Sequence, residues 1–182
     1  MSSLTIAAML SLAQACGANV APGTLLSIAW AESHWNATAE NHNRNGTVDR
    51  GAMQINSENW QRLGLTRESA SDPCNSIRAG ARVLMENYHP KDNTPEEQQR
   101  ALRVALAAYN AGPRGGPNEV YIRKVQAAAA YVIPEIRIAG IPATTAAPSP
   151  AVRPTQPPPP PPDVTARPAS AGRELVFTRG NQ

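Results

Sequence analysis

Apolar residues recur three, four and seven positions apart in five stretches of this chain, which is the spacing of one helix face. Leu102, Ala105, Leu106 and Tyr109 form one such stripe. No run of alternating residues is long enough for a sheet, so we predict an all-α domain. The five helices are expected at about 4–16, from Pro22, from Pro73, from Pro95 up to Gly112-Pro113, and at about 118–133.

Start signals precede three of these helices. Pro22 suits a first helical turn, where its missing N–H has no partner to lose. Asp72 before Pro73 is a typical N-cap. Residues 94–97, Thr-Pro-Glu-Glu, fit a capping box with proline in the first turn. The other core-facing stripes are Ile77, Ala81, Leu84 and Tyr88, and Tyr121, Val125, Ala128 and Val132.

The composition changes after about residue 140. Of the 18 prolines, 11 lie between Pro142 and Pro168, including the unbroken run Pro157 to Pro162. Such a run forms an extended, solvated helix that cannot close a core. We therefore expect one domain at 1–140 and a disordered proline-rich tail at 141–182, whose last ten residues are either frayed or a short docking segment.

The net charge of +3 and the pI of about 9.2 mildly favour anionic partners. No basic cluster with interleaved aromatics is present, so nucleic acid is not an expected partner. The apolar stretch "LTIAAML" is too short for a transmembrane segment. Cys16 and Cys74 are too far apart for a redox or zinc pair, which leaves two buried thiols or one disulfide.

Glu32 occupies an unusual position for a carboxylate. Leu25, Ile28, Ala29 and Glu32 share one face of the second helix, so Glu32 continues an apolar stripe. It also falls in the last turn, where the helix dipole is negative. Both features raise the pKa of a carboxyl group, as a general acid near neutral pH requires. The alternative is that Glu32 points outward from a frayed helix end.

The polar loop that follows does not fit a metal site. Residues 41–46 contain the asparagines and glycine of a calcium loop, but Ala52 stands where its glutamate belongs. His34 and His42 do not form a helical zinc pair. We expect no metal and no cofactor.

The segment "GAMQIN" closes this loop. Gly51 permits close approach of backbones, and Met53 and Ile55 alternate with Gln54 and Asn56. One side therefore packs while the uncharged amides project, which suits a substrate rich in hydroxyl and acetamido groups, namely a sugar polymer. The alternative is a turn and short strand without a ligand.

Together, Glu32-Ser33, the segment 51–56 and Ala108-Tyr109-Asn110 resemble the three-motif signature of soluble lytic transglycosylases with a goose-type-lysozyme-like domain. The resemblance covers about residues 4–135. "VDRGAMQIN" is most similar to the branch associated with type IV secretion and conjugation. Ala52 stands where the usual motif has leucine, which is a conservative departure.

This resemblance implies cleavage of the β-1,4 bond between N-acetylmuramic acid and N-acetylglucosamine without water. The muramic 6-hydroxyl attacks the anomeric carbon and gives a 1,6-anhydro product. One carboxyl group then suffices, because no water needs activation by a second. Glu32 would protonate the leaving oxygen and afterwards accept the proton of the 6-hydroxyl.

The resemblance also implies the roles of other residues. Asp49 would stabilise positive charge at the anomeric carbon or hold a water; the alternative is a loop carboxylate paired with Arg50 or Arg44. Tyr109 would place its hydroxyl near Glu32, and Ser33 would contact Glu32 or the sugar. The implied substrate-binding residues are Ser33, Gly51, Met53, Gln54, Asn56, Tyr109 and Asn110.

The same branch commonly pairs two cysteines that correspond to Cys16 and Cys74, and the alternative is a reactive Cys74 thiol at a helix N-terminus. The expected partners are peptidoglycan strands and, through the tail, secretion-system components, and the protein is expected to be a monomer. We expect a periplasmic location, although no basic residue precedes Arg44 to suggest a signal peptide.

Three alternative functions remain at this point. The first is a hydrolase of the same fold, a muramidase or chitinase. The second is a glycan-binding assembly protein without catalysis. The third is a wall-opening enzyme carried by a phage.

Overall fold

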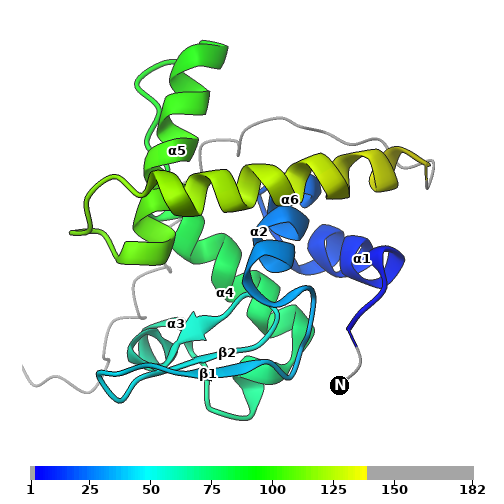
Figure 1. Cartoon of the computed structure of the whole chain (residues 1–182), viewed down its shortest axis with the longest axis vertical. Helices are drawn as coiled ribbons and strands as arrows, with labels where there is room; N and C mark the ends of the chain where they lie inside the picture. Colours follow the sequence, from blue (N-terminus) through cyan, green and yellow to red (C-terminus); the bar gives the residue numbers. More distant parts are fainter. Residues whose placement is uncertain (1–2, 139–182) are drawn as a thin grey trace, which may run out of the picture. The chain divides into compact units, whose positions relative to one another are not determined.

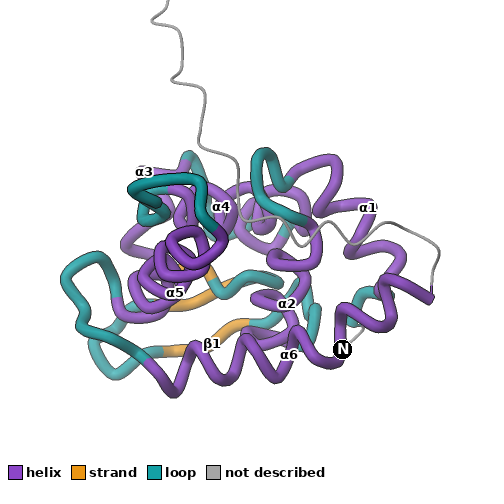
Figure 2. Tube along the Cα trace, turned by 90° about the horizontal axis from the view of Figure 1, so that it is seen from above, coloured by secondary structure: helices purple, strands orange, loops and turns teal. Residues whose placement is uncertain are grey.

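The computed structural model describes residues 3–138, and within this range the chain is mostly helical. Figure 2 shows helix (purple) over most of the trace and the strands (orange) in one region. The predicted proline-rich tail lies outside the described residues, so the division into domain and tail stays a prediction. The helices are α1 (Ile6–Cys16), α2 (Pro22–Ser33), the single turn α3 (Trp60–Leu63), α4 (Pro73–Met85), α5 (Pro95–Ala111) and α6 (Glu119–Ile138).

The helix starts agree with the capping signals, with one exception. The Asp72 side chain accepts a 2.8 Å hydrogen bond from the Asn75 amide at the start of α4. Thr94 likewise accepts from the Glu97 amide at 3.4 Å. The reciprocal half of the predicted capping box is absent, because Asp92 accepts from the Thr94 amide and Glu97 from the Lys91 amide. The first-turn prediction was therefore half right.

The last helix is longer than predicted and continues through Pro134 to Ile138. Proline costs this helix one backbone hydrogen bond. The side chain of Ile136, which is 1% exposed, continues the buried face of Val132 beyond the proline. We infer that this burial keeps the final turn helical.

The all-α prediction missed a small antiparallel sheet. Its strands are β1 (Glu40–His42), β2 (Val48–Arg50) and β3 (Ile55–Asn56), in the order β1-β2-β3. These strands have two or three residues each, so the alternation at residues 53–56 was too short to predict a sheet. The register places Asp49 opposite Asn41 on one side and opposite Asn56 on the other. The fold is thus mostly helical with a three-stranded sheet.

Helix α2 is buried along most of its length, because α1 packs on it and α6 runs across it (Figure 1). It ends abruptly after Ser33, since His34 and Trp35 adopt left-handed backbone conformations with φ of 54° and 61°. The Trp35 ring N–H donates a 2.9 Å hydrogen bond to the Leu26 carbonyl and fixes this chain reversal. The last turn of α2, which carries Glu32, is therefore held rigidly.

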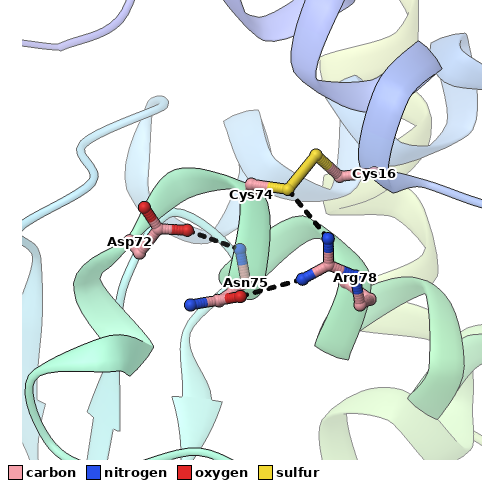
Figure 3. Close-up of a disulfide and its surroundings, with 5 residues drawn as sticks. All are labelled: Cys16, Asp72, Cys74, Asn75 and Arg78. Carbon is pink, nitrogen blue, oxygen red and sulfur yellow. Dashed lines mark hydrogen bonds between the residues drawn. A yellow bond between two sulfur atoms is a disulfide. The ribbon is translucent and has the colours of Figure 1, made fainter.

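The Cys16–Cys74 disulfide joins the end of α1 to the first turn of α4 (Figure 3), which confirms the pairing implied by the family resemblance. Arg78, one turn further along α4, donates to the Cys74 sulfur and to the Asn75 side chain. Linking two segments far apart in the chain restricts the unfolded state and stabilises the fold.

Candidate active site

A cleft of about 1230 Å³ opens beside Glu32. Its walls come from the end of α2, the sheet and the loop within it, α3 and the residues before it, the end of α4, the end of α5 and one side of α6. Amides and charged groups dominate the walls. The lining residues are Glu32, Asn41, Asn43, Arg44, Asn45, Thr47, Asp49, Gln54, Ile55, Asn56, Glu58, Asn59, Arg62, Val83, Glu86, Asn87, Ala108, Tyr109, Asn110, Ala111, Gly112, Pro113 and Lys124.

The Glu32 carboxyl group is half-buried at this cleft, and its Oε1 accepts a 2.5 Å hydrogen bond from the Tyr121 hydroxyl. Burial raises the pKa of Glu32 above its ordinary value of 4.5, and the negative charge of Asp49 adds to this rise. The Tyr121 hydrogen bond and the positive charge of Lys124 act in the opposite direction but do not cancel it. Burial thus favours the neutral form of the Glu32 carboxyl group. The Tyr121 hydroxyl can stabilise its charged form by donating a hydrogen bond.

Asp49 lies on the same cleft, in the middle strand of the sheet. Its Oδ2 accepts a 2.9 Å hydrogen bond from the side-chain NH₂ of Asn43. Its Oδ1 accepts a 2.8 Å hydrogen bond from the side-chain NH₂ of Asn56. Arg50 pairs instead with Glu40, so the side chain of Asp49 is held by two neutral amides and not by this arginine. A carboxylate fixed in this way presents its negative charge to the cleft at a defined position.

The amides of "GAMQIN" reach the cleft while the apolar side chains pack beneath them. Met53 and Ile55 are buried, although Ile55 still borders the cleft, and Gln54 and Asn56 line it. Gln54 adopts a left-handed backbone with φ of 48°, and its side-chain NH₂ donates to the carbonyls of Gly51 and Ala39. These contacts fix the orientation of the Gln54 side chain.

Three of the expected substrate-binding residues lie behind the cleft wall and are not among its lining residues. Ser33 donates a 2.8 Å hydrogen bond to the Ala52 carbonyl and so attaches the end of α2 to the loop. Gly51 has φ of 84°, and a Cβ there would lie 2.2 Å from the Ala70 carbonyl oxygen. The Met53 amide donates to the Ser76 hydroxyl. These contacts hold the loop against α2 and α4.

Tyr109 and Asn110, at the end of α5, line the cleft. The Tyr109 hydroxyl donates a 2.8 Å hydrogen bond to the Met53 carbonyl, and its ring is stacked against that of Tyr121. Burial raises the pKa of Tyr109 well above its usual value, and the charge of Glu32 contributes to the shift. The side-chain oxygen of Asn110 accepts a 2.6 Å hydrogen bond from the side-chain NH₂ of Asn118.

Sequence reasoning missed three residues of this site. The sequence predicts Tyr121 as a packing residue of the last helix. A buried tyrosine hydroxyl usually needs a hydrogen-bond partner, but the sequence does not identify Glu32 as that partner. The position of Asn43 in the sequence indicates only a ligand of a calcium loop. Lys124 had no local signal at all, because its relation to Glu32 arises from the packing of α6 across α2.

The chain is similar to known proteins over most of its length. Residues 9–132 match the family model described as the transglycosylase SLT domain, and the chain belongs to this family. It is 34% identical to protein virB1 of Agrobacterium fabrum over 73% of this chain and 64% of that protein. It is 30% identical to the type IV secretion system protein virB1 of Brucella abortus, over 81% of this chain and 76% of the relative.

A third relative is the invasion protein IagB of Salmonella typhimurium, which is 36% identical over 58% of this chain and 62% of that protein. The chain thus spans less than two thirds of the length of the Agrobacterium relative, at 64%. Within residues 3–138, no helix combines the length and the apolar character that crossing a membrane requires.

Proposed function

We propose that this protein is a peptidoglycan lytic transglycosylase that cleaves the β-1,4 bond between N-acetylmuramic acid and N-acetylglucosamine. The observation that carries the proposal is the Glu32 carboxyl group, which has a raised pKa and a Tyr121 hydrogen bond at the wall of a cleft rich in amides. Its membership of the transglycosylase SLT domain family supports the same activity.

In the first step, the neutral Glu32 carboxyl group donates its proton to the glycosidic oxygen while the bond from this oxygen to the anomeric carbon breaks. The N-acetylglucosamine side leaves as an alcohol, and positive charge develops at the anomeric carbon. Burial supports this step because it favours the protonated form of Glu32.

In the second step, the Glu32 carboxylate accepts the proton of the muramic 6-hydroxyl, and that oxygen bonds to the anomeric carbon. The product is a 1,6-anhydro sugar, no water is consumed, and Glu32 is again protonated. The Tyr121 hydroxyl stabilises the carboxylate that exists between the two steps, since it donates to Oε1.

Asp49 stabilises the positive charge that develops at the anomeric carbon. Two amide donors, from Asn43 and Asn56, support a fixed negative charge at this position before substrate arrives. Such a preorganised charge lowers the barrier without a cost of reorganisation during the reaction.

The remaining residues divide into two groups. Gln54, Asn56, Tyr109 and Asn110 contact the glycan, since they line the cleft. Ser33, Gly51 and Met53 act as positioning residues, because their hydrogen bonds and close contacts hold the loop that carries Gln54 and Asn56. The reaction needs no metal and no cofactor in this scheme.

We further propose that the enzyme acts in the periplasm and opens the wall for a type IV secretion or conjugation apparatus. The Brucella relative, with type IV secretion in its name, supports this context. The proline-rich region at 141–182 would serve as a tether or bind a component of the apparatus, and the protein would act as a monomer.

A muramidase is the second candidate, because Asp49 supplies a second carboxyl group at the same cleft. Product mass separates the two reactions. Digestion of purified peptidoglycan should release muropeptides with anhydro ends, each lighter by one water than a hydrolysed end. Hydrolysed ends would instead establish the muramidase.

Two variants complete this experiment. Glu32→Gln should lower the rate by about 10²–10⁴, the usual contribution of a general acid. Glu96→Gln, an isosteric change at an exposed site on α5, is the matched control and should cleave normally. A protein that functions only as a glycan binder would give no products, and its biological role would survive the Glu32→Gln change.

A further inference from the structure

Three cations line the cleft, and they differ in how their charge is balanced. Arg62 forms an ion pair with Glu86 and a hydrogen bond with Asn59. Arg44 also forms no ion pair among residues 3–138, but it lies in the loop between β1 and β2 and its charge is not among those that shift the pKa of Glu32. Lys124 has no carboxylate within ion-pair distance among residues 3–138, and it is the lining cation whose charge acts on Glu32. Lys124 is therefore an uncompensated positive charge beside the acid.

The position of Lys124 along the cleft follows from α6. Tyr121 and Lys124 are three residues apart and lie on the same side of this helix. Tyr121 contacts Glu32, so Lys124 stands slightly less than one turn, roughly 4.5 Å, further along the helix axis. An ammonium group on a flexible stem at this place can reach a group attached to the sugar beside the scissile bond.

The substrate has one feature that matches such a cation. Its sugar rings are uncharged, but the muramic ring carries a lactyl ether two carbons from the anomeric carbon that reacts. This arm ends either in its own carboxylate or, through an amide, in a peptide with further carboxylates. It is thus the route by which negative charge comes close to the reaction centre.

We propose that Lys124 binds a carboxylate on the lactyl arm of the muramic residue whose anomeric carbon reacts, and that it thereby selects muramic substrates. This inference rests on the proposed function and extends it to substrate selection. The carboxylate has two sources, the free lactyl group of peptide-free strands and the stem peptide of intact strands. An exposed ion pair of this kind is worth about a fivefold change in kcat/KM.

The experiment compares intact peptidoglycan with strands freed of peptide by an amidase. Half of each substrate is coupled to methylamine with a carbodiimide, which neutralises its carboxylates. The rate of formation of anhydro ends is then measured with the unmodified protein and with Lys124→Gln. We expect Lys124→Gln to form anhydro ends about fivefold more slowly than the unmodified protein on the native form of one substrate. On the neutralised form of that substrate, the two proteins should have the same rate.

Two variants control for charge and for the pKa of Glu32. Arg123→Gln removes the same charge from the adjacent, exposed position outside the cleft and should behave as the unmodified protein. Lys124→Arg keeps the charge and should retain the faster rate on native than on neutralised substrate. Loss of Lys124 also raises the pKa of Glu32, but this affects native and neutralised substrates alike, so the ratio of their rates isolates binding.

The outcomes separate the two proposals. Lys124→Gln should be slower than the unmodified protein on the native form of one substrate only, and that substrate identifies the source of the carboxylate. Equal losses on native and neutralised forms of both substrates, or no loss at all, would overturn the role of Lys124. Absence of anhydro ends with the unmodified protein would overturn the proposed function. Binding of soluble peptide-free and peptide-bearing strands to Glu32→Gln, with and without Lys124→Gln, tests the contact without relying on the reaction.

Discussion

The hydroxyl of Tyr121 on α6 donates a 2.5 Å hydrogen bond to Oε1 of Glu32 on α2. This contact favours the carboxylate, while burial of the same group favours the protonated acid. Burial prevails, so the pKa of Glu32 is raised. A group that first donates and then accepts a proton must be able to adopt both the protonated and the ionised form. Burial stabilises the first form of Glu32, and the Tyr121 hydrogen bond stabilises the second.

Replacement of Tyr121 by phenylalanine should move the alkaline limb of the pH–rate profile to higher pH. The change removes a donor that lowers the pKa of Glu32, so the acid keeps its proton to a higher pH. The intermediate carboxylate also loses its support, and kcat/KM should fall about tenfold to a hundredfold. Tyr131→Phe, at an exposed tyrosine of the same helix, is the control. An unchanged alkaline limb would show that Tyr121 does not act on Glu32.

Asp49→Asn should move the same limb the other way. The negative charge of Asp49 raises the pKa of Glu32, so its removal lets Glu32 lose its proton at lower pH. Loss of the fixed charge should also lower the rate by about 10²–10³. If the rate were retained at low pH, Asp49 would act only through the pKa of Glu32.

Stability should respond to pH through Glu32. Its pKa is higher in the folded protein than the ordinary 4.5, so its contribution to folding is fully present below 4.5 and is lost as pH rises through the folded value. Glu32→Gln abolishes this dependence. Between about pH 4 and about pH 8, the melting temperature of the unmodified protein should therefore fall relative to that of Glu32→Gln. A difference that stays constant with pH would contradict a raised pKa.

Local signals in the sequence were sufficient for most helix boundaries. Proline and N-cap residues at the starts of α4 and α5 act within one turn, and burial follows the apolar stripes. The position of Glu32 could be inferred in the same way, from neighbours on its own helix. The contact with Tyr121 could not, because it depends on the angle at which α6 crosses α2. The sheet escaped prediction because the pairing of its short strands, and not their side-chain pattern, defines it.

Gly51 and Gly46 provide a matched pair for testing how the loop is held. Their φ angles are 84° and 83°, but a Cβ at Gly51 would collide with the Ala70 carbonyl, whereas nothing lies within 4 Å at Gly46. Gly46→Ala should lower the unfolding free energy by about 1 kcal/mol, because alanine is strained in a left-handed backbone conformation. Gly51→Ala adds overpacking and should cost about 2–5 kcal/mol.

Denaturant unfolding of the two variants measures this difference. Activity should fall with Gly51→Ala under conditions where the variant is still folded, because the loop carries Gln54 and Asn56 into the cleft. Equal destabilisation by the two substitutions would mean that the close approach to Ala70 is not formed in solution.

The most direct test of the account is an NMR titration of the Glu32 side-chain carboxyl carbon, assigned by comparison with Glu32→Gln. We predict a midpoint above the ordinary value of 4.5, and a higher one still in Tyr121→Phe. A carboxyl group that titrates at or below 4.5 in the free protein would contradict the claim that Glu32 is held as a proton donor.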